Sequence, residues 1–437
     1  MSHIFARSAT PLPKAVSAEG VWITDENGKR YIDGSGGAIV VNIGHGVDDV
    51  RHAMTEQAAK VSYVHGTSFT TEALEEFGER LAPHLPMDDP AIYPVSGGSE
   101  AVETAFKMAR AFHLASGDDG RHKIISRWGS YHGNTRGALD ASGRAPLRAP
   151  YLPWLDKAIH VPPVYEYRCP MPDHPRACGA AHAAELERVI LAEGPETVAA
   201  FIAEPIGGAT LGAVVPPEDY WPSVVEVCRR HGVLVIADEV MTGFGRTGKW
   251  FGVDHWNVQP DLLTSGKGCS AGYWPLGLTV ASGRVAVALR EKGFVHGFTY
   301  SHHAVGAAVG TAVLERLERD DLVERSHTHG DALQAMLRGL LGEHPHVGDI
   351  RGSGLMVAIE FVADRETKAA FPRADKVTER MVAACKERGL LVYSGTGCAD
   401  GTDGDLIMFG PPFVISDAEL DQLVSITAEA VGEVLPG

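Results

Sequence analysis

The chain has 437 residues, of which 44% are hydrophobic and 22% charged, a composition typical of a globular protein with more than one domain. Its formal net charge is −17 and is spread along the chain, which argues against nucleic acid or an anionic membrane as partner because both repel acidic surfaces. The six cysteines form no CxxC pair, no apolar run is long enough to span a membrane, and the first residues lack a secretory core. We therefore expect a soluble, cytoplasmic protein.

The first elements along the chain are a hairpin, a strand and a helix. Residues 20–33 alternate apolar and polar on both sides of Asn27-Gly28, a dipeptide that favours a type I′ turn, so they predict a β-hairpin. Residues 91–96 predict a short strand, and residues 99–116 have apolar positions at helical spacing.

Short apolar segments then alternate with helical patterns. Runs rich in Val, Ile and Leu that are separated by helices predict a mainly parallel sheet covered on both faces. We assign this large domain to residues 60–290. Its further predicted strands are residues 123–126, 198–205, 232–240 and 261–268.

The pattern changes after about residue 300 and predicts a smaller α+β domain. We expect the amino-terminal hairpin to pack with it, so that the small domain comprises residues 1–59 and 291–437. Its predicted elements are helices in 304–341, a strand at 354–362, a helix at 374–389, a strand at 390–393 and a last helix from Ser416.

Asp238 and Lys267 carry the strongest chemical signal. Asp238 ends an apolar strand and opens the stretch DEVMTGFGRTG, and Lys267 follows 29 residues later between two glycines. Ligands of open α/β sheets bind at the carboxyl ends of strands, where both residues are expected. The pair suits pyridoxal 5′-phosphate (PLP), because a lysine forms a Schiff base with its aldehyde and a carboxylate keeps its pyridine nitrogen protonated. Taken singly, a surface lysine and a helix-capping aspartate are the alternatives.

Two loops offer a phosphate seat and an aromatic ring. Ser96-Gly97-Gly98-Ser99 precedes a predicted helix, whose free N–H groups and dipole can bind one phosphate. The nucleotide P-loop ending of Lys-Ser/Thr is missing. Tyr131, in the loop SYHGN, can lay its ring on a flat cofactor. An ordinary helix start and a half-buried loop tyrosine are the structural alternatives.

Together these residues resemble the class III aminotransferases, which have PLP fold type I. The resemblance runs along nearly the whole chain, and the DEVMTGFGRTG motif with its distance to the lysine is highly specific. It implies an α/β fold with a large, mainly parallel sheet of the seven-stranded type and a smaller α+β domain. The matching stretches are Asp33-Gly34, residues 42–45, SGGSEAVETAFKMAR (96–110), SYHGNT (130–135), AEPI (203–206), DEVMTGFGRTG (238–248), SGKG (265–268), residues 272–277 and residues 409–412.

The resemblance also implies the role of each residue. Lys267 resembles the Schiff-base lysine that shuttles the proton, and Asp238 resembles the partner of the pyridinium nitrogen. A buried strand-end carboxylate is the alternative for Glu204. A phosphate site shared between subunits implies an obligate homodimer, alone or within a tetramer. The other implied cofactor contacts are Gly98 and Ser99 at the phosphate, Tyr131 and Val240 on the two ring faces, Glu204 beside the cofactor, and Thr299 at the phosphate of the neighbouring subunit.

The chain departs from the family at its substrate grip. Members that use 2-oxoglutarate or ornithine often read EPIQGE and RFAPP, and their Glu and Arg pair with each other. Here Ala209 stands at the glutamate position and Met408 at the arginine position, and Ile39 lies near an entrance tryptophan position. Methionine cannot replace the bidentate guanidinium that holds a carboxylate. We therefore expect a pocket formed by Ile39, Tyr131, Ala209 and Met408, with ω-amines or β-amino acids as donors and a 2-oxo acid such as pyruvate as acceptor.

The sequence is also compatible with other functions. A racemase or epimerase, a decarboxylase or an aminomutase keeps the same cofactor and fold. A non-enzymatic PLP-binding module is the third reading, although the acidic charge argues against a DNA-binding regulator.

Two segments outside the motifs are interpreted as loops. Cys169, His174, Cys178 and His182 lie within 14 residues among prolines, but their spacing is not a recognised zinc pattern. We interpret this segment as a surface loop and predict no metal. Residues 394–405 are small or acidic and predict a flexible loop near the substrate entrance.

Overall fold

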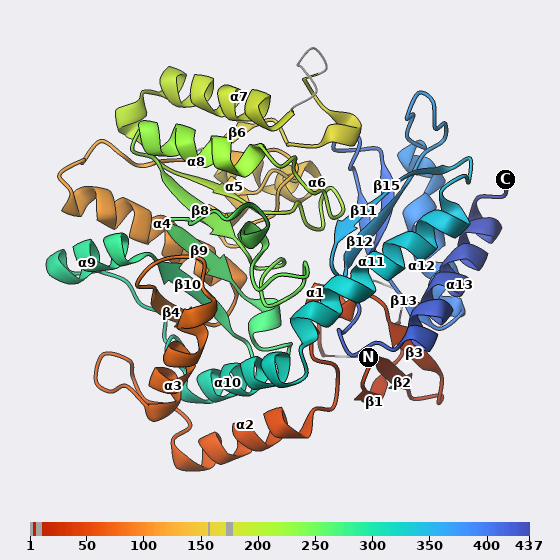
Figure 1. Ribbon diagram of the computed structural model, residues 1–437, viewed down its shortest axis with the longest axis horizontal. Helices are drawn as coiled ribbons and strands as arrows, with labels where there is room; N and C mark the ends of the chain where they lie inside the picture. Colours follow the sequence, from red (N-terminus) through yellow and green to blue (C-terminus); the bar gives the residue numbers. More distant parts are fainter. Residues whose placement is uncertain (1–2, 6–10, 156–157, 172–177) are drawn as a thin grey trace.

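A computed structural model of the chain describes residues 3–5, 11–155, 158–171 and 178–437. A seven-stranded sheet occupies one part of the molecule and two four-stranded sheets the other (Figure 1). The strand order of the seven-stranded sheet is β4-β10-β9-β8-β7-β5-β6. Only β10 pairs antiparallel with its neighbours, so the predicted, mainly parallel sheet is confirmed. Its strands are β4 (Ala91–Val95), β5 (Lys123–Arg127), β6 (Ile159–Val161), β7 (Val198–Ala203), β8 (Leu234–Asp238), β9 (Leu262–Ser265) and β10 (Gly277–Ala281).

Helices cover both faces of this sheet, as the apolar strands predict. In β7 the side chains of Ala200 and Ile202 pack against α4 and α9, whereas Phe201 and Ala203 belong to the core that includes α7 and α8. Side chains that alternate along the strand therefore contribute to two hydrophobic layers, one on each face of the sheet. The helices are α4 (Gly98–Ala115), α5 (Arg136–Ala141), α6 (Ala145–Arg148), α7 (Cys178–Glu193), α8 (Tyr220–Arg230) and α9 (Gly283–Lys292).

The amino-terminal hairpin is confirmed, but the prediction of a type I′ turn is wrong. Gly28 has a φ of 80°, whereas Asn27 is not among the residues with positive φ. The carboxylate Oδ1 of Asp25 accepts hydrogen bonds from the backbone N–H of Asn27 and of Lys29, which holds a longer loop in place of the two-residue turn. The strands are β1 (Ala15–Glu19), β2 (Trp22–Asp25) and β3 (Arg30–Asp33).

Residues 390–393 do not form one strand as predicted. β13 (Leu390–Leu391) pairs in parallel with β3, whereas β14 (Tyr393–Thr396) pairs with β15 (Asp405–Phe409) in a different sheet. The predicted loop 394–405 thus begins in β14 and ends at the first residue of β15. Periodicity could not separate the two strands, because both are short and partly apolar.

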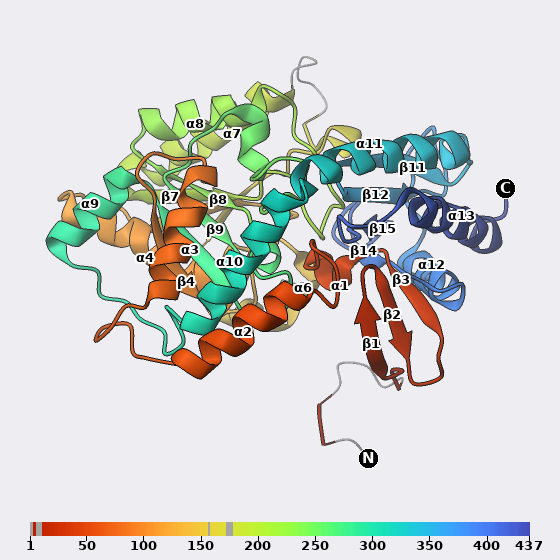
Figure 2. The ribbon, with the colours of Figure 1, turned by 60° about the horizontal axis from the view of Figure 1, so that its bottom comes forward.

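Helices α11 and α12 pack against the carboxyl-terminal sheet β11-β12-β15-β14, and α13 packs against these two helices (Figure 2). Ser416 and Glu419 form a capping box at the start of α13, which explains the predicted helix start. The elements are α11 (Leu322–Leu341), β11 (Val347–Ser353), β12 (Met356–Phe361), α12 (Val377–Glu387) and α13 (Asp417–Val434).

Helices α2 (Asp48–Lys60) and α3 (Glu72–Leu81) both pack against α10 (Ala304–Arg319). This group joins segments on both sides of the boundaries drawn at residues 60 and 290, and the domain division itself stays a prediction. None of the helices in the described ranges has the length and apolarity required to cross a membrane.

Candidate active site

Five loops that follow strands of the large sheet meet at one edge. Because β4, β5, β7, β8 and β9 run in the same direction, their carboxyl ends lie together, which is where open α/β sheets bind ligands. The predicted cofactor residues stand there: Gly98 and Ser99 after β4, Tyr131 after β5, Glu204 after β7, Asp238 at the end of β8 and Lys267 after β9.

Asp238 is buried and its carboxylate is held on both oxygens. Oδ2 lies 2.6 Å from Nδ1 of His132. Oδ1 accepts hydrogen bonds from the N–H of Val240 at 3.1 Å and from Oγ1 of Thr264 at 3.2 Å. These contacts fix the carboxylate at the strand end, so a ligand atom meets an oriented group.

Sequence reasoning gave no role to His132, which the structure joins directly to Asp238. Its ring is buried, and Nε2 has no hydrogen-bond partner among the described residues. The available signal was a titratable ring next to Tyr131, in a loop expected at the same sheet edge as Asp238. A spacing of 106 residues hides the pair from local patterns.

Lys267 begins a short 3-10 helix with a φ of 45°, an uncommon conformation for a residue with a side chain. Burial lowers the pKa of Lys267 to about 8, against the opposing effect of Asp238 and Glu204. A lysine with this pKa carries an appreciable unprotonated fraction near neutrality, which is the nucleophilic form.

The start of α4 touches the loops after β8 and β9. A Cβ on Gly98 would lie 2.9 Å from Cγ1 of Val240, and a Cβ on Gly266 would lie 3.5 Å from the N of Gly98. Oγ of Ser99 accepts a hydrogen bond from the N–H of Asn134 at 3.1 Å. The first turn of this 18-residue helix has no side-chain cap at Gly97, so its N–H groups, which lie next to Gly266, are available to an anion.

Glu204 is buried, and burial raises its pKa to about 7. Oε1 accepts the N–H of Gly208 at 3.2 Å, whereas Oε2 has no partner among the described residues. Buried polar atoms are normally hydrogen-bonded, so the orphaned Oε2 and the orphaned Nε2 of His132 fit a site that a polar ligand completes. The helix start, the oriented Asp238 and the nucleophilic Lys267 likewise fit PLP.

Three of the four predicted pocket residues share one apolar cluster. Ile39, Ala209 and Met408 are buried together with Ile206, Met241 and Leu406. Ile39 ends α1 (Gly36–Ile39) with a φ of 58°, and a Cβ on Gly410 would clash with its side chain. The fourth, Tyr131, is half-buried, and its hydroxyl accepts a hydrogen bond from Nδ2 of Asn134 at 3.2 Å.

Thr299 lies on the surface, in an exposed segment after α9. Its carbonyl oxygen accepts a hydrogen bond from the hydroxyl of Tyr63 at 2.9 Å. Val295 and Tyr300 nearby are 98% and 63% exposed.

Comparison with known proteins decides the family, because residues 4–431 match the model of the family described as Aminotransferase class-III. The chain belongs to the class III aminotransferases. It is 36% identical to the diaminobutyrate–2-oxoglutarate transaminase of Halomonas elongata over 98% of this chain and 92% of that protein. It is also 35% identical to the taurine–pyruvate aminotransferase of Bilophila wadsworthia over 94% and 90% of the two chains.

A solved relative has the same fold. An (S)-enantioselective omega-transaminase from Thermomicrobium roseum superimposes with a TM-score of 0.92 and 39% identity, over 99% of this class III chain and 97% of that one. The predicted fold type I, the PLP cofactor and the transfer of an amino group to a 2-oxo acid are therefore confirmed.

Proposed function

We propose that this aminotransferase takes ω-amines or β-amino acids as donors and a small 2-oxo acid such as pyruvate as acceptor. The main support for this proposal is that Met408 and Ala209 are buried in one apolar cluster, at the positions where the resemblance expects an arginine and a glutamate. A buried thioether and a methyl group offer no charge to a second substrate carboxylate. An amino donor that has no second carboxylate loses no binding energy from the missing arginine.

We assign the cofactor chemistry to the residues around Lys267. When bound, PLP supplies an electron-accepting ring next to the amino group in transfer. Lys267 Nζ would hold the cofactor through its aldehyde carbon and would carry the transferred proton, and Asp238 Oδ2, held by His132, would keep the pyridine nitrogen protonated. The N–H groups at Gly98 and Ser99 would bind the phosphate. Val240 and Tyr131 would lie against the ring, and Glu204 would offer its free Oε2 beside them.

We further propose that the enzyme works as a homodimer in the cytoplasm. The exposed segment around Thr299, with apolar Val295 and Tyr300, supports a subunit interface in which Thr299 reaches the partner's phosphate. Size measurement of the holoenzyme tests the dimer, and a monomer with full activity would contradict it.

A donor–acceptor panel tests the substrate class. We expect turnover of ω-amines with pyruvate, and a kcat/KM for 2-oxoglutarate lower by about tenfold or more, the loss expected when one charged hydrogen bond is missing. Fast turnover of glutamate with 2-oxoglutarate, and none with pyruvate, would refute the proposal. The conversion of bound PLP to pyridoxamine phosphate by the amine alone is the control that separates transfer from racemisation.

A further inference from the structure

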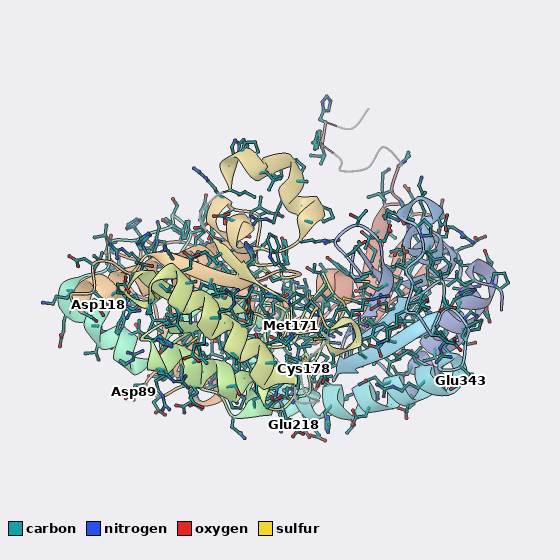
Figure 3. The ribbon with its side chains drawn as sticks, turned by 90° about the horizontal axis from the view of Figure 1, so that it is seen from above. Asp89, Asp118, Met171, Cys178, Glu218 and Glu343 are labelled. Carbon is teal, nitrogen blue, oxygen red and sulfur yellow. The ribbon has the colours of Figure 1, made fainter. Side chains whose placement is uncertain are left out.

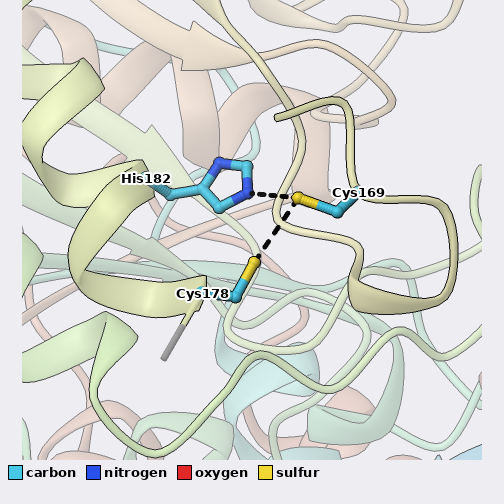
Figure 4. Close-up of side chains that lie close together, drawn as sticks. All are labelled: Cys169, Cys178 and His182. Carbon is cyan, nitrogen blue, oxygen red and sulfur yellow. Dashed lines mark hydrogen bonds between the residues drawn. The ribbon is translucent and has the colours of Figure 1, made fainter. Parts of the chain in front are cut away.

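Three potential metal ligands converge outside the PLP site. Cys169 follows a 3-10 turn (η3, Glu166–Arg168), whereas Cys178 and His182 lie in α7 (Figure 4). Their ligand atoms all lie within 4.8 Å of one another. The prediction of a surface loop is therefore wrong for Cys178 and His182, which are buried on a helix. His174 lies outside the described residues.

The helix explains why two of the donors share a direction. Cys178 and His182 are four residues apart, and residues at that spacing lie on the same face of an α-helix. Cys169 meets this face from the preceding turn. The three donors thus come from two elements, which is the arrangement by which a metal ion holds chain segments together.

The two distances from the sulfur of Cys169 match edges of a coordination tetrahedron. Sγ of Cys169 lies 3.6 Å from Sγ of Cys178 and 3.7 Å from Nε2 of His182. With Zn–S of about 2.3 Å and Zn–N of about 2.05 Å, the ligand atoms of a tetrahedral zinc ion stand about 3.5–3.8 Å apart. A disulfide would require the sulfurs to approach to about 2.05 Å.

We propose that Cys169, Cys178 and His182 bind one Zn²⁺ ion through two thiolates and one imidazole nitrogen. Two thiolates balance the charge of the ion, and a neutral imidazole adds none, so the half-buried site stays neutral overall. Each Zn–S bond forms as a thiol proton leaves for solvent. A solvent or other donor takes the fourth position.

Zinc binding at this site should depend on pH. A cysteine must lose its thiol proton to bind the ion, so zinc affinity should fall as pH decreases.

The site lies next to a contact between two parts of the molecule. Figure 3 places Cys178 and Met171 near the middle of the molecule, where α7 approaches the carboxyl-terminal part. Just before Cys169, Nε of Arg168 lies 2.5 Å from Oε1 of Glu360 in β12, and Tyr165 donates a hydrogen bond to Oε2 of the same residue. Arg168 also lines a cavity of about 240 Å³ against residues 396–401. Zinc at this point would hold this segment in register with α7.

Metal analysis of the tag-free holoenzyme tests the proposal. We expect about one Zn²⁺ per chain, removable by a chelator at mildly acidic pH and restored by Zn²⁺ alone at neutral pH. Co²⁺ in its place should give sulfur-to-metal charge-transfer absorption and the intense visible bands of tetrahedral cobalt. Cys178→Ala, Cys169→Ala and His182→Ala should each lose the metal, whereas Cys385→Ala, a matched buried helical cysteine, should keep it.

Several outcomes would overturn the assignment. The first is that the wild-type protein takes up no zinc at micromolar concentration, a result that depends on the folding of no variant. The second is that the Cys178→Ala protein keeps its full metal content. The third is that the wild type forms a Cys169–Cys178 disulfide, seen by mass, while its reduced form binds neither Zn²⁺ nor Co²⁺. Bound PLP, measured by its visible absorption, reports folding of each variant and separates this site from the transferase chemistry.

Discussion

Nδ1 of His132 lies 2.6 Å from Oδ2 of Asp238, and both side chains are almost fully buried. The contact joins a loop after β5 to the end of β8. It orients the one carboxylate that we assign to the pyridine nitrogen, so we expect His132 to act on the cofactor through Asp238.

Replacement of His132 should therefore weaken cofactor binding. A hydrogen bond to a charged group contributes about 1.5–3 kcal/mol, so His132→Asn should raise the dissociation constant of PLP by about tenfold or more. Equilibrium titration followed by the cofactor's visible absorption measures it. His122→Asn, at an exposed histidine, is the control, and an unchanged constant in His132→Asn would contradict the assigned role.

Gly98 and Gly97 form a matched pair at the start of α4. A Cβ at Gly98 would lie 2.9 Å from Cγ1 of Val240, whereas a Cβ at Gly97 meets nothing within 4 Å. Gly98→Ala should displace the phosphate seat and weaken PLP binding by about tenfold, or about 1.4 kcal/mol, while Gly97→Ala stays near wild type. Equal effects of the two substitutions would refute the seat.

Lys267 should destabilise the cofactor-free fold at neutral pH. Its folded pKa of about 8 lies below its ordinary value of 10.5, so the unfolded chain holds the proton more tightly. The penalty is fully present below pH 8 and disappears as pH rises through 10.5. Lys267→Met, although inactive, should thus be more stable than cofactor-free wild type at pH 7 by about 2 kcal/mol, and the gain should shrink above pH 9.

Denaturant unfolding at pH 7 and pH 10 measures this difference. Lys249→Met removes an exposed lysine and should change neither value. A gain that stays constant with pH would show that lost charge is not its cause.

Glu360 is the centre of a buried ionic contact between β12 and its neighbours. Oε2 lies 2.9 Å from Nη1 of Arg351, and Oε1 contacts Arg168. Glu360→Gln removes the carboxylate charge that faces Arg168 and leaves Arg351 with Asp349, and should cost about 3 kcal/mol of stability, seen as a lower melting temperature. Glu343→Gln removes an exposed carboxylate whose contact to Arg365 is 3.8 Å, and should change little. Equal melting temperatures would contradict the importance of the buried contact.

Met408 offers a test of the substrate pocket. Met408→Arg alone buries an unpaired charge and should destabilise the protein by several kcal/mol. The double variant Ala209→Glu, Met408→Arg restores the pair described for the 2-oxoglutarate-using members and should recover part of that loss. The melting temperatures of the three proteins measure it, and a double variant no more stable than the single one would show that the two positions do not meet.

Local patterns predicted most of the large sheet and the loops that carry its chemistry. Strands β4, β5, β7, β8 and β9 are apolar runs with clear ends, and strand ends bring Asp238, Lys267 and Glu204 to one edge by topology alone, whereas β6 was not predicted. The capping box at Ser416 is equally local.

The misses depend on contacts between distant residues. His132 meets Asp238 across 106 positions. Cys169 and His182 are close in sequence, but the segment was interpreted as a loop, and only helix α7 puts Cys178 and His182 on one face. The change of sheet between Leu391 and Tyr393 depends on which partner strand is nearest, which no window of a few residues contains.

The pairing of β3 with β13 has a consequence for protein synthesis. Lys29 and Glu387, which are hydrogen-bonded beside this pairing, are separated by 358 positions, and the indole of Trp22 donates to Glu419 across 397. The hairpin leaves the ribosome before its partners, and the separation is 358 positions for Lys29 and Glu387. Its free strand edge must wait while these residues are made, and this is the interval in which a nascent chain would gain most from a chaperone.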